Sequence, residues 1–404
     1  MANPTEKPAL KLKRLQDLSL KGKRALVRVD FNVPIKSSKI EDNARIRETL
    51  PTLKHLRENG AKIAIIAHLG RPKGKPEPKY SLKPVAAELS KLLGCPVAFA
   101  DDCVGPVAEK AVAALKAGDV LLLENLRFHA GEEANDADFA KQLSKLGDVF
   151  IQDAFGALHR AHASTAGIPK NIPGAIGFLV QKELELLDRV IGNPTRPFLA
   201  VIGGAKVSDK LGVLNKLLDR LDGLVIGGGM AYTFLAAQGI SIGKSLLEKD
   251  KVQDAQGVIE KAYAKKVECL LPADHLCVRE IKPDAQTTVT QAMSIPAELI
   301  GVDIGPHATE FFVEEIGKAK TIFWNGPMGI FEIDAFAKGS MEVAKAMAEA
   351  TKNGAVTIVG GGDSLSVLAK AGLADQMTHC STGGGASLEL LEGKALPGLV
   401  ALAS

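Results

Sequence analysis

Four arginines and one histidine in the first 160 residues follow short apolar runs: Arg45, Arg71, Arg127, Arg160 and His68. Arginine binds carboxylate and phosphate groups through a planar fork of N–H donors. Such side chains gathered at one place would bind a small polyanion. Each arginine taken alone is as well explained by solvated surface charge, and that alternative stays open at this point. Arg28 and His162 are expected to be structural hydrogen-bonding or pairing partners.

Glycine clusters replace the arginines in the second half of the chain. The clusters are at 203–204, 227–229, 360–362 and 383–385. Glycine lets backbone N–H groups approach an anion, and a helix that starts there adds a favourable dipole. Lys206 and Lys210 could add positive charge at nucleotide phosphates, and Asp363 could hold Mg²⁺ together with waters and phosphate oxygens. Tight turns without any ligand are the alternative interpretation.

The spacing of apolar residues predicts the scaffold that carries these groups. Short runs rich in Val, Ile and Leu alternate with stretches of helical periodicity, which is typical of buried parallel strands joined by crossover helices. The predicted strands are 24–29, 62–67, 97–100, 120–123, 149–152, 198–202, 224–226, 268–271, 299–302, 321–324 and 356–359. The fold class is therefore α/β. The polar residues follow the carboxyl ends of strands, where open parallel sheets bind ligands.

The alternation of strands and helices restarts near the middle of the chain. A helix is predicted over 180–191, and the turn-forming residues 192–197 (GNPTRP) end it. We therefore expect two α/β domains of similar size, joined by a helix and a short hinge. The apolar tail after residue 388 is too short to span a membrane and is expected to pack on the body of the protein.

Composition and charge exclude several classes of protein. The 404 residues are 46% hydrophobic and 24% charged, which is an ordinary globular mixture. Fifty Lys and Arg against 47 Asp and Glu do not indicate a dedicated nucleic-acid binder. Five cysteines without a C-x-x-C pair, and an N-terminus without an apolar signal-peptide core, predict a reduced cytoplasmic chain. We expect no membrane partner and, without an additional amphipathic face, a monomer.

Several motifs together resemble the phosphoglycerate kinase family, in family order from about residue 20 to the C-terminus. They are RVDFNVP at 28–34, HLGRP at 68–72, ENLRF at 124–128, DAFG at 153–156, HRAH at 159–162, GGAKVSDK at 203–210, WNGP at 324–327, GGGDS at 360–364 and STGGGA at 381–386. The resemblance implies two Rossmann-like three-layer domains with parallel sheets. Residues 1–185 would bind 3-phosphoglycerate, the segment 389–404 would return to them, and residues 186–388 would bind the nucleotide.

The resemblance also implies a reaction. A phosphoryl group would pass reversibly, with Mg²⁺, between ATP and the carboxylate of 3-phosphoglycerate, with hinge-bending closure of the domains. In glycolysis, 1,3-bisphosphoglycerate and ADP would give 3-phosphoglycerate and ATP. The family more often has threonine where this chain has Ser364, and the hydroxyl group is retained.

Site residues follow from the resemblance by position. The substrate-binding set is Asp30, Phe31, Asn32, Arg45, His68, Leu69, Gly70, Arg71, Arg127 and Arg160. The nucleotide-binding set is Gly203, Gly204, Lys206, Lys210, Gly227, Gly228, Gly301, Asn325, Glu332, Gly361, Gly362, Asp363 and Ser364, with Asp363 orienting the metal and Glu332 toward the ribose. The catalytic set is Arg45, Lys206, Gly361 and Gly384.

The chemistry of such a transfer needs no general base. The acceptor carboxylate, with a pKa of about 4, is already ionised near pH 7. The difficulty is the approach of one anion to another, so catalysis consists of positioning and charge neutralisation. Arg45 and Lys206 would stabilise the transferring group, and Arg71, Arg127 and Arg160 would hold the distal phosphate of the substrate.

Two other interpretations compete with this one. Another two-domain enzyme that uses a nucleotide, such as a dehydrogenase or a sugar-nucleotide transferase, is disfavoured because no G-x-G-x-x-G follows a predicted strand. A non-catalytic anion-binding protein could share the fold, since fold does not determine function. The combination of Arg45, Lys206 and Asp363 argues against it, because a pure binder does not need all three.

Overall fold

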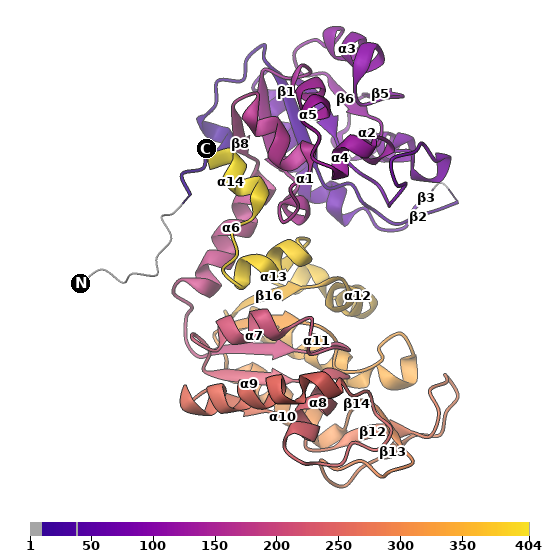
Figure 1. The fold of residues 1–404 in the computed structure, drawn as a ribbon, viewed down its shortest axis with the longest axis vertical. Helices are drawn as coiled ribbons and strands as arrows, with labels where there is room; N and C mark the ends of the chain where they lie inside the picture. The colour runs from indigo at the N-terminus through magenta and orange to yellow at the C-terminus, as the bar shows by residue number, and fades with distance from the viewer. Residues whose placement is uncertain (1–9, 38, 404) are drawn as a thin grey trace, which may run out of the picture. The chain divides into compact units, whose positions relative to one another are not determined.

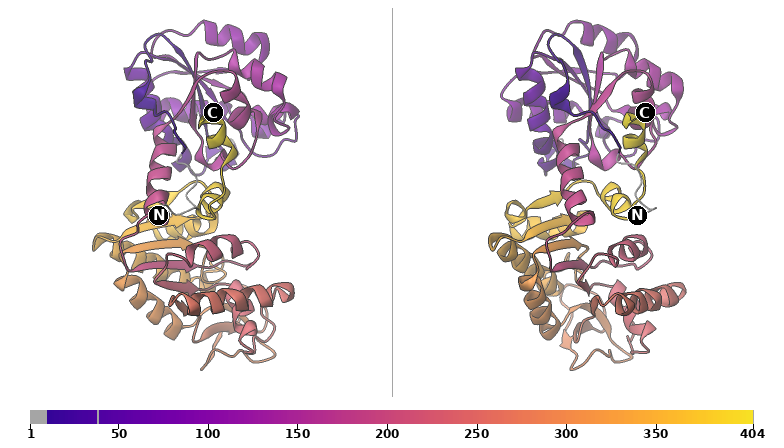
Figure 2. Two further views of the ribbon diagram at one scale, coloured as in Figure 1. Left: turned by 60° about the vertical axis from the view of Figure 1, so that its left-hand side comes forward. Right: turned by 90° about the vertical axis from the view of Figure 1, so that its left-hand side faces the viewer.

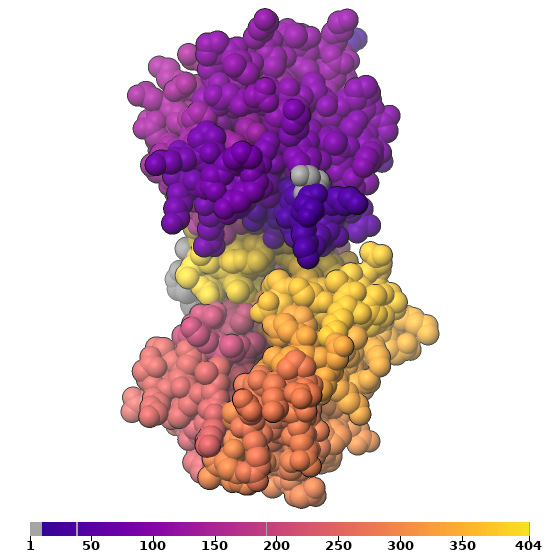
Figure 3. Space-filling model, turned by 90° about the vertical axis from the view of Figure 1, so that its right-hand side faces the viewer, coloured from indigo at the N-terminus to yellow at the C-terminus, as the bar shows by residue number. Residues whose placement is uncertain are grey.

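The computed structural model describes residues 10–37 and 39–403, which form two compact units (Figure 1). The first unit contains the described residues up to Glu185 and the segment from Ala395 onward, and the second contains Leu186–Lys394. Figure 3, coloured by residue number, shows the first unit mainly in indigo to magenta and the second mainly in magenta to yellow. The expectations about the N-terminus fall largely on residues 1–9, outside the described residues.

A parallel sheet with strand order β5-β6-β4-β1-β7-β8 forms the centre of the first unit. Its strands are β1 (Arg24–Val29), β4 (Lys62–Ile66), β5 (Val97–Ala100), β6 (Val120–Leu123), β7 (Val149–Asp153) and β8 (Gly174–Ile176). Successive residues of a strand face opposite sides, so Ala25, Val27 and Val29 join one apolar cluster and Leu26 joins another. Because both faces are apolar, both need a covering layer of helices.

Helices cover both faces of this first sheet. α1 (Ala44–Glu58) and α2 (Lys83–Leu93) contribute to one apolar cluster, and α3 (Gly105–Ala113) and α5 (Ala137–Ser144) contribute to the other. α2 shows the local cause of a helix boundary, because Pro84 lies in its first turn and Gly94 ends it in the left-handed conformation with φ of 65°. The result is a three-layer arrangement. A short hairpin of β2 (Ile35–Lys36) and β3 (Lys39–Ile40) follows β1.

The second unit repeats this arrangement around a parallel sheet with order β11-β10-β9-β15-β16-β17. Its strands are β9 (Phe198–Ile202), β10 (Gly223–Ile226), β11 (Glu268–Leu270), β15 (Thr321–Asn325), β16 (Val356–Gly360) and β17 (His379–Ser381). α10 (Pro306–Lys318), α11 (Lys338–Lys352) and α12 (Gly362–Ala371) share one apolar cluster with the sheet. α7 (Leu211–Leu217), α8 (Met230–Ala237) and α9 (Val252–Ala264) lie on the opposite side (Figure 1). The two parallel sheets confirm the predicted α/β class.

The predicted strand at 299–302 does not belong to the parallel series. It is β14 (Ile300–Ile304), which pairs antiparallel with β12 (His275–Val278), and β12 in turn pairs with β13 (Thr288–Val289). An apolar run identifies a buried strand but not its partner. β12 has four residues and β13 has two, of which those of β13 are exposed, so neither strand formed an apolar run long enough to be predicted.

The connection between the units and the end of the chain also have defined elements. α6 (Phe178–Ile191) crosses from the first unit into the second. α13 (Gly385–Leu391) contacts α7 within the second unit, whereas α14 (Pro397–Ala403) lies on the first unit (Figure 2). The N–H of Gly398 donates to the carbonyl of Leu158 at 3.0 Å. Residues 389–394, expected to return with the tail, therefore remain with the second unit, because α13 continues to Leu391.

Candidate functional site

The carboxyl edge of the first sheet holds an ion pair between Arg45 and Asp30. Asp30 directly follows β1, and its Oδ2 accepts a hydrogen bond from Arg45 Nη1 at 2.7 Å. The Asp30 side chain is 7% exposed, whereas that of Arg45, at the start of α1, is 35% exposed. The buried carboxylate thus orients a guanidinium whose remaining donors are open to a ligand.

Hydrogen bonds tie the loops after β1, β4 and β6 together. The N–H of Gly70 donates to Asn32 Oδ1 at 2.9 Å, and Arg127 Nη1 donates to the carbonyl of Gly70 at 2.8 Å. Arg127 is 4% exposed, and its Nε lies 3.3 Å from Glu133 Oε1. Burial lowers the pKa of Arg127, partly offset by the Glu133 charge. Its buried Nε has this ion pair but no well-aligned hydrogen bond among the described residues, so it keeps a donor that a bound anion could accept.

His68 lies where the charges of several arginines converge. Its ring is buried, and Nδ1 lies 3.0 Å from Arg28 Nη2. Burial lowers the pKa of His68 well below its usual value, and the positive charges of Arg28, Arg127, Arg45 and Arg160 lower it further. The fold therefore brings three of the four predicted arginines, Arg45, Arg127 and Arg160, close enough to act on one imidazole.

The remaining predicted substrate residues fall into two groups. Phe31 and Leu69 have buried side chains in the apolar cluster of the first unit, so these side chains hold the loops rather than face a ligand. Arg71 is exposed directly after Gly70. Arg160 is partly exposed, and its Nε donates to His159 Nε2 at 3.2 Å.

Backbone hydrogen bonds join three glycine-rich loops at the carboxyl edge of the second sheet. Gly203 N donates to Asn325 O at 3.0 Å, and Gly204 N donates to Pro327 O at 2.9 Å. Gly228 has a φ of +66°, and a Cβ there would lie 2.7 Å from the backbone of Gly204. A Cβ on Gly203 or Gly227 would collide with Pro327 or Met328. Close approach of the loops thus requires glycine at these positions.

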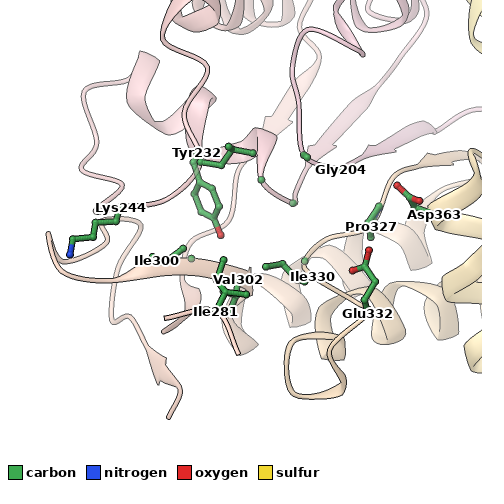
Figure 4. A pocket seen from close by; sticks show the side chains of 16 residues that line it. Gly204, Tyr232, Lys244, Ile281, Ile300, Val302, Pro327, Ile330, Glu332 and Asp363 are labelled. Atoms are coloured by element: carbon green, nitrogen blue, oxygen red, sulfur yellow. The ribbon is translucent and has the colours of Figure 1, made fainter. Parts of the chain in front are cut away.

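A cavity of about 480 Å³ opens at this edge (Figure 4). Five predicted nucleotide residues line it: Gly204, Gly228, Gly301, Glu332 and Asp363. Apolar side chains that the sequence did not single out complete the wall: Leu246, Ile281, Ile300, Val302 and Ile330. In Figure 4 the carboxylates of Glu332 and Asp363 lie at the same end, and Lys244 lies at the other. Such a site has an apolar body and few polar groups, which suits a ligand with an aromatic base.

Tyr232 is a further residue of this wall. Its ring is buried, and burial raises the pKa of its hydroxyl, which therefore stays protonated. A Cβ on Gly301 would lie 2.2 Å from the Tyr232 Oη, so glycine is required at 301 by packing. Tyr232 lies in the first turn of the helix that follows Gly229. This position beside a glycine cluster is the one feature of the sequence that could have indicated a place in the nucleotide site.

Two predicted lysines and two helix starts follow strands at the same edge of the sheet, although they do not line the cavity. Lys210 Nζ donates to Asn325 Oδ1, and burial lowers the pKa of Lys210, with Asp209 and Asp363 acting in the opposite sense. Gly361 precedes α12 with a φ of +90°, and Gly384 precedes α13 with a φ of +51°. Lys206 and Gly362 are exposed.

The side chain of Ser364 has a local role. It is fully buried, and its Oγ accepts a hydrogen bond from the N–H of Gly326 at 2.6 Å. This bond fastens the loop after β15 to the start of α12. The hydroxyl therefore holds the loop, and only its own proton could reach a further acceptor.

Asp363 has the surroundings expected of a magnesium ligand. It is exposed in the first turn of α12, and its carboxylate makes no hydrogen bond or ion pair with the described residues. Mg²⁺ prefers one or two carboxylates with waters and phosphate oxygens in the remaining positions. The donor set at this end of the cavity fits that preference.

A second group of potential metal ligands lies in the first unit. Single ligand atoms of Asp102, Cys103 and His129 lie within 4.8 Å of one another. However, His129 Nε2 is hydrogen-bonded to Asp102 Oδ1 at 2.7 Å, and the same oxygen accepts the N–H of Cys103 at 2.7 Å. Burial raises the pKa of the Cys103 thiol well above its usual value. The group is thus a satisfied hydrogen-bonded cluster with a protonated thiol, and we assign no metal to it.

These features define a two-unit α/β protein of the nucleotide-dependent phosphotransfer class. A family model described as phosphoglycerate kinase matches residues 15–394. The chain is 54% identical over 393 residues to a phosphoglycerate kinase of Elusimicrobium minutum, covering 97% of this chain and 98% of that protein. It is 53% identical over 392 residues to a phosphoglycerate kinase of Chlorobium chlorochromatii, covering 96% and 99%.

Solved structures agree with the sequence relatives. Phosphoglycerate kinase from Coxiella burnetii superposes with a TM-score of 0.86 at 43% identity, and that from Pyrococcus horikoshii with 0.84 at 34% identity. Each comparison covers 97% of this chain and 98% of the other. The chain belongs to the phosphoglycerate kinase family and catalyses the glycolytic transfer of a phosphoryl group between ATP and the carboxylate of 3-phosphoglycerate. No helix among the described residues is long and apolar enough to cross a membrane.

Proposed function

We propose that 3-phosphoglycerate binds at the carboxyl edge of the first sheet and that the Mg-nucleotide binds in the cavity of the second unit. The observation that carries this assignment is the difference between the two places. Guanidinium groups dominate the first, which suits a small ligand with several negative charges. Glycine-lined loops and an apolar wall dominate the second, which suits phosphates joined to a base.

The residue roles follow from position and charge. Arg71, Arg127 and Arg160 hold the phosphate of 3-phosphoglycerate, and Asp30, Asn32 and His68 complete that site. The glycines, Lys210, Asn325 and Glu332 belong to the nucleotide site. Arg45 and Lys206 neutralise charge on the transferring phosphoryl group, assisted by the N–H groups of Gly361 and Gly384. The carboxylate acceptor attacks directly, because it is ionised without a base.

Magnesium enters this scheme as part of the nucleotide substrate. Asp363 holds the ion at the acidic end of the cavity, with waters and phosphate oxygens as its other ligands. The ion supplies positive charge to the phosphate oxygens, and the protein supplies the position.

Because the two ligands belong to different units, transfer requires the units to close around the hinge after α6. Closure would bring the acceptor in line with the nucleotide and exclude water, which suppresses hydrolysis of ATP. We place this enzyme in the cytoplasm as a monomer that needs no nucleic-acid or membrane partner. Its five cysteines form no disulfide with one another, which supports an assignment to a reducing compartment.

One coupled assay tests the proposed pair of substrates. With ATP, Mg²⁺ and 3-phosphoglycerate together, we expect ADP to form, and we expect omission of any one of the three to abolish the reaction. ADP formation that is independent of 3-phosphoglycerate would contradict the proposal. Isothermal titration with each ligand alone should show two independent sites, one lost in Arg127→Ala and the other retained.

A further inference from the structure

Arg28 is a buried arginine that cannot itself serve as a surface anion site. Its side chain is 1% exposed on β1, and it uses three different N–H groups inside the protein. Nε donates to Ser164 Oγ at 2.9 Å, Nη1 donates to the carbonyl of Val29, and Nη2 lies 3.0 Å from His68 Nδ1. The guanidinium of Arg28 is thus held in a single orientation against the imidazole of His68.

The contact with His68 determines where the ring carries its proton. A guanidinium has donors and no acceptor, and it stays charged in proteins. His68 Nδ1 must therefore be the acceptor in this hydrogen bond. In a neutral imidazole the proton then lies on Nε2. Nε2 makes no hydrogen bond with the described residues, so this N–H is available to donate to a ligand.

The charges that face His68 favour the neutral ring. Arg28 reaches it from β1, Arg45 from α1, Arg127 from the turn after β6 and Arg160 from the loop after β7. A proton on Nδ1 would oppose the Arg28 N–H directly, and a positive ring would add a further charge to this group. His68 therefore differs from its arginine neighbours, since it offers a neutral donor where they offer charged ones.

A buried carboxylate compensates the charge of Arg28. Ser164 Oγ donates to Glu132 Oε1 at 2.6 Å, and Ser164 N donates to Glu132 Oε2 at 3.0 Å. Glu132, on α4 (Ala130–Glu133), is fully buried, and His162 Nδ1 lies 3.7 Å from its Oε1. Burial alone would raise the pKa of Glu132, but His162, Arg28 and Ser164 hold it below its usual value. Arg28 and Glu132 therefore carry opposite charges, and Ser164 on η5 (Ala163–Gly167) bridges them.

We propose that Arg28, anchored by Ser164 and compensated in charge by Glu132, fixes the tautomer of His68, so that Nε2–H is presented as a neutral hydrogen-bond donor to the anionic substrate. Arg28 is a positioning residue in this scheme, because it acts through His68. The identity of the substrate rests on the function proposed above, whereas the tautomer does not, and the two can be tested separately.

The first measurement uses the wild-type enzyme without ligands. ¹⁵N-histidine labelling reports the protonation of each ring nitrogen through its chemical shift, and loss of one signal pair in His68→Gln assigns His68 among the eight histidines. We expect a neutral ring with the proton on Nε2 at pH 7. A proton on Nδ1, or a positively charged ring, would overturn the inference.

The second measurement removes the donor. The double variant Arg28→Met with Glu132→Gln removes both the Arg28 donor to His68 and the buried charges of Arg28 and Glu132, and we expect the His68 signals to move toward a mixture of tautomers. The matched control is Glu132→Gln alone, which keeps the Arg28 donor and should keep the wild-type tautomer. His275, whose Nε2 lies 2.9 Å from the carbonyl of Met293 in the second unit, should be unchanged throughout, which would show that the effect is confined to the first unit.

Steady-state kinetics test whether His68 contacts 3-phosphoglycerate, independently of which nitrogen carries the proton. We expect the double variant to raise KM for 3-phosphoglycerate about tenfold, the scale for losing one hydrogen bond to a charged group, with KM for Mg-ATP unchanged. If the tautomer shifts while this KM does not, Arg28 does fix the ring but His68 does not contact the substrate as proposed. If Glu132→Gln alone shifts the tautomer as far as the double variant, the donor role of Arg28 is refuted. If the double variant does not fold, Ser164→Ala takes its place, because it removes the acceptor for Arg28 Nε. We expect both tautomers of His68 to be populated in Ser164→Ala. A His68 ring that keeps its proton on Nε2 alone would refute the anchoring of Arg28 by Ser164.

Discussion

The two units present different chemical groups at the same structural position, the carboxyl edge of a parallel sheet. In the first unit these groups are side chains, with Arg45 oriented by Asp30 and Arg127 by the carbonyl of Gly70. In the second unit they are mainly glycine-rich backbone loops after β9, β10 and β15, which the N–H groups of Gly204 and Gly228 hold together by donating to the carbonyls of Pro327 and Met328. The layers beneath are alike, so the difference lies in the loops.

This difference determines which substitutions each site tolerates. A site made from side chains loses its function when a side chain is truncated. A site made from backbone groups loses its function when a side chain is added where loops approach closely. The first unit should therefore be sensitive to Arg→Ala, and the second to Gly→Ala.

Arg45→Ala should lower kcat by at least about 100-fold, the scale seen when one transition-state donor is removed. Arg47→Ala, an exposed position on the same helix, is the matched control and should leave kcat near the wild-type value. Steady-state assays with both substrates saturating measure the difference. A kcat of Arg45→Ala close to that of the control would remove Arg45 from the catalytic set.

Lys206→Ala should lower kcat by about tenfold or more, because a point charge is lost at the transferring group in the second unit. KM for 3-phosphoglycerate should stay unchanged. Lys216→Ala, an exposed lysine on α7, serves as the control. A change confined to KM for ATP would assign Lys206 to binding alone.

Asp363→Asn should weaken the use of Mg-ATP by about tenfold and leave the affinity for 3-phosphoglycerate intact, because the metal loses a charged ligand. Titration of each ligand separately, at several Mg²⁺ concentrations, distinguishes the two. Asp375→Asn, at an exposed position beyond α12, should behave as wild type. Unchanged Mg-ATP kinetics in Asp363→Asn would count against the metal role.

Gly228→Ala should raise KM for Mg-ATP about tenfold without truncating any side chain. The new Cβ would lie 2.7 Å from the backbone of Gly204, so the loops must separate. Gly354→Ala is the control, because its φ of +88° is equally unfavourable but no heavy atom lies within 4 Å. The difference in free energy of unfolding between the two variants should be about 1–3 kcal/mol. Equal effects in both would mean that backbone strain alone, and not loop contact, decides.

A pH dependence of the free energy of unfolding is expected in both units, with no direct effect on either ligand site. Burial raises the pKa of Asp153 in the first unit and of Asp303 in the second to about 7 each. The unfolded chain releases these protons near pH 4, so the folded state binds more protons between about pH 4 and 7. The contribution of each group to the free energy of unfolding therefore falls as pH rises through that window, and the loss is complete above it.

Asp153→Asn and Asp303→Asn should each reduce the fall in the free energy of unfolding between about pH 4 and 7. Urea unfolding at several pH values measures it, with fluorescence of Trp324, the single tryptophan, reporting the second unit. The Trp324 signal should respond to Asp303→Asn. If the free energy of unfolding depends on pH in the same way in wild type and variants from pH 4 to 8, the assigned pKa directions are contradicted.

The sequence predicted the parallel strands best. The predicted bounds of β1, β5, β6 and β9 match those observed, because each strand is a short, mainly apolar run that polar or turn-forming residues bound on both sides. The arginines of the first unit were equally accessible to prediction, since strand ends in a parallel sheet meet at one edge.

The features that the sequence did not reveal depend on contacts between distant segments. The wall of the cavity combines Tyr232 of α8 with Ile300 of β14 and Ile281 of a loop, and their apolar character resembles that of any core residue. Glu132 occurs in a polar stretch typical of a solvated helix, yet it is fully buried against Ser164. No local pattern predicts such a partner across more than 30 residues.

A crystal structure of the enzyme with 3-phosphoglycerate and Mg-ADP bound together tests the division of labour most directly. We expect 3-phosphoglycerate among Arg71, Arg127 and Arg160 of the first unit, and ADP with its base against the apolar wall that includes Tyr232 and Ile300. Both ligands within a single unit, or a nucleotide held by those arginines, would contradict it.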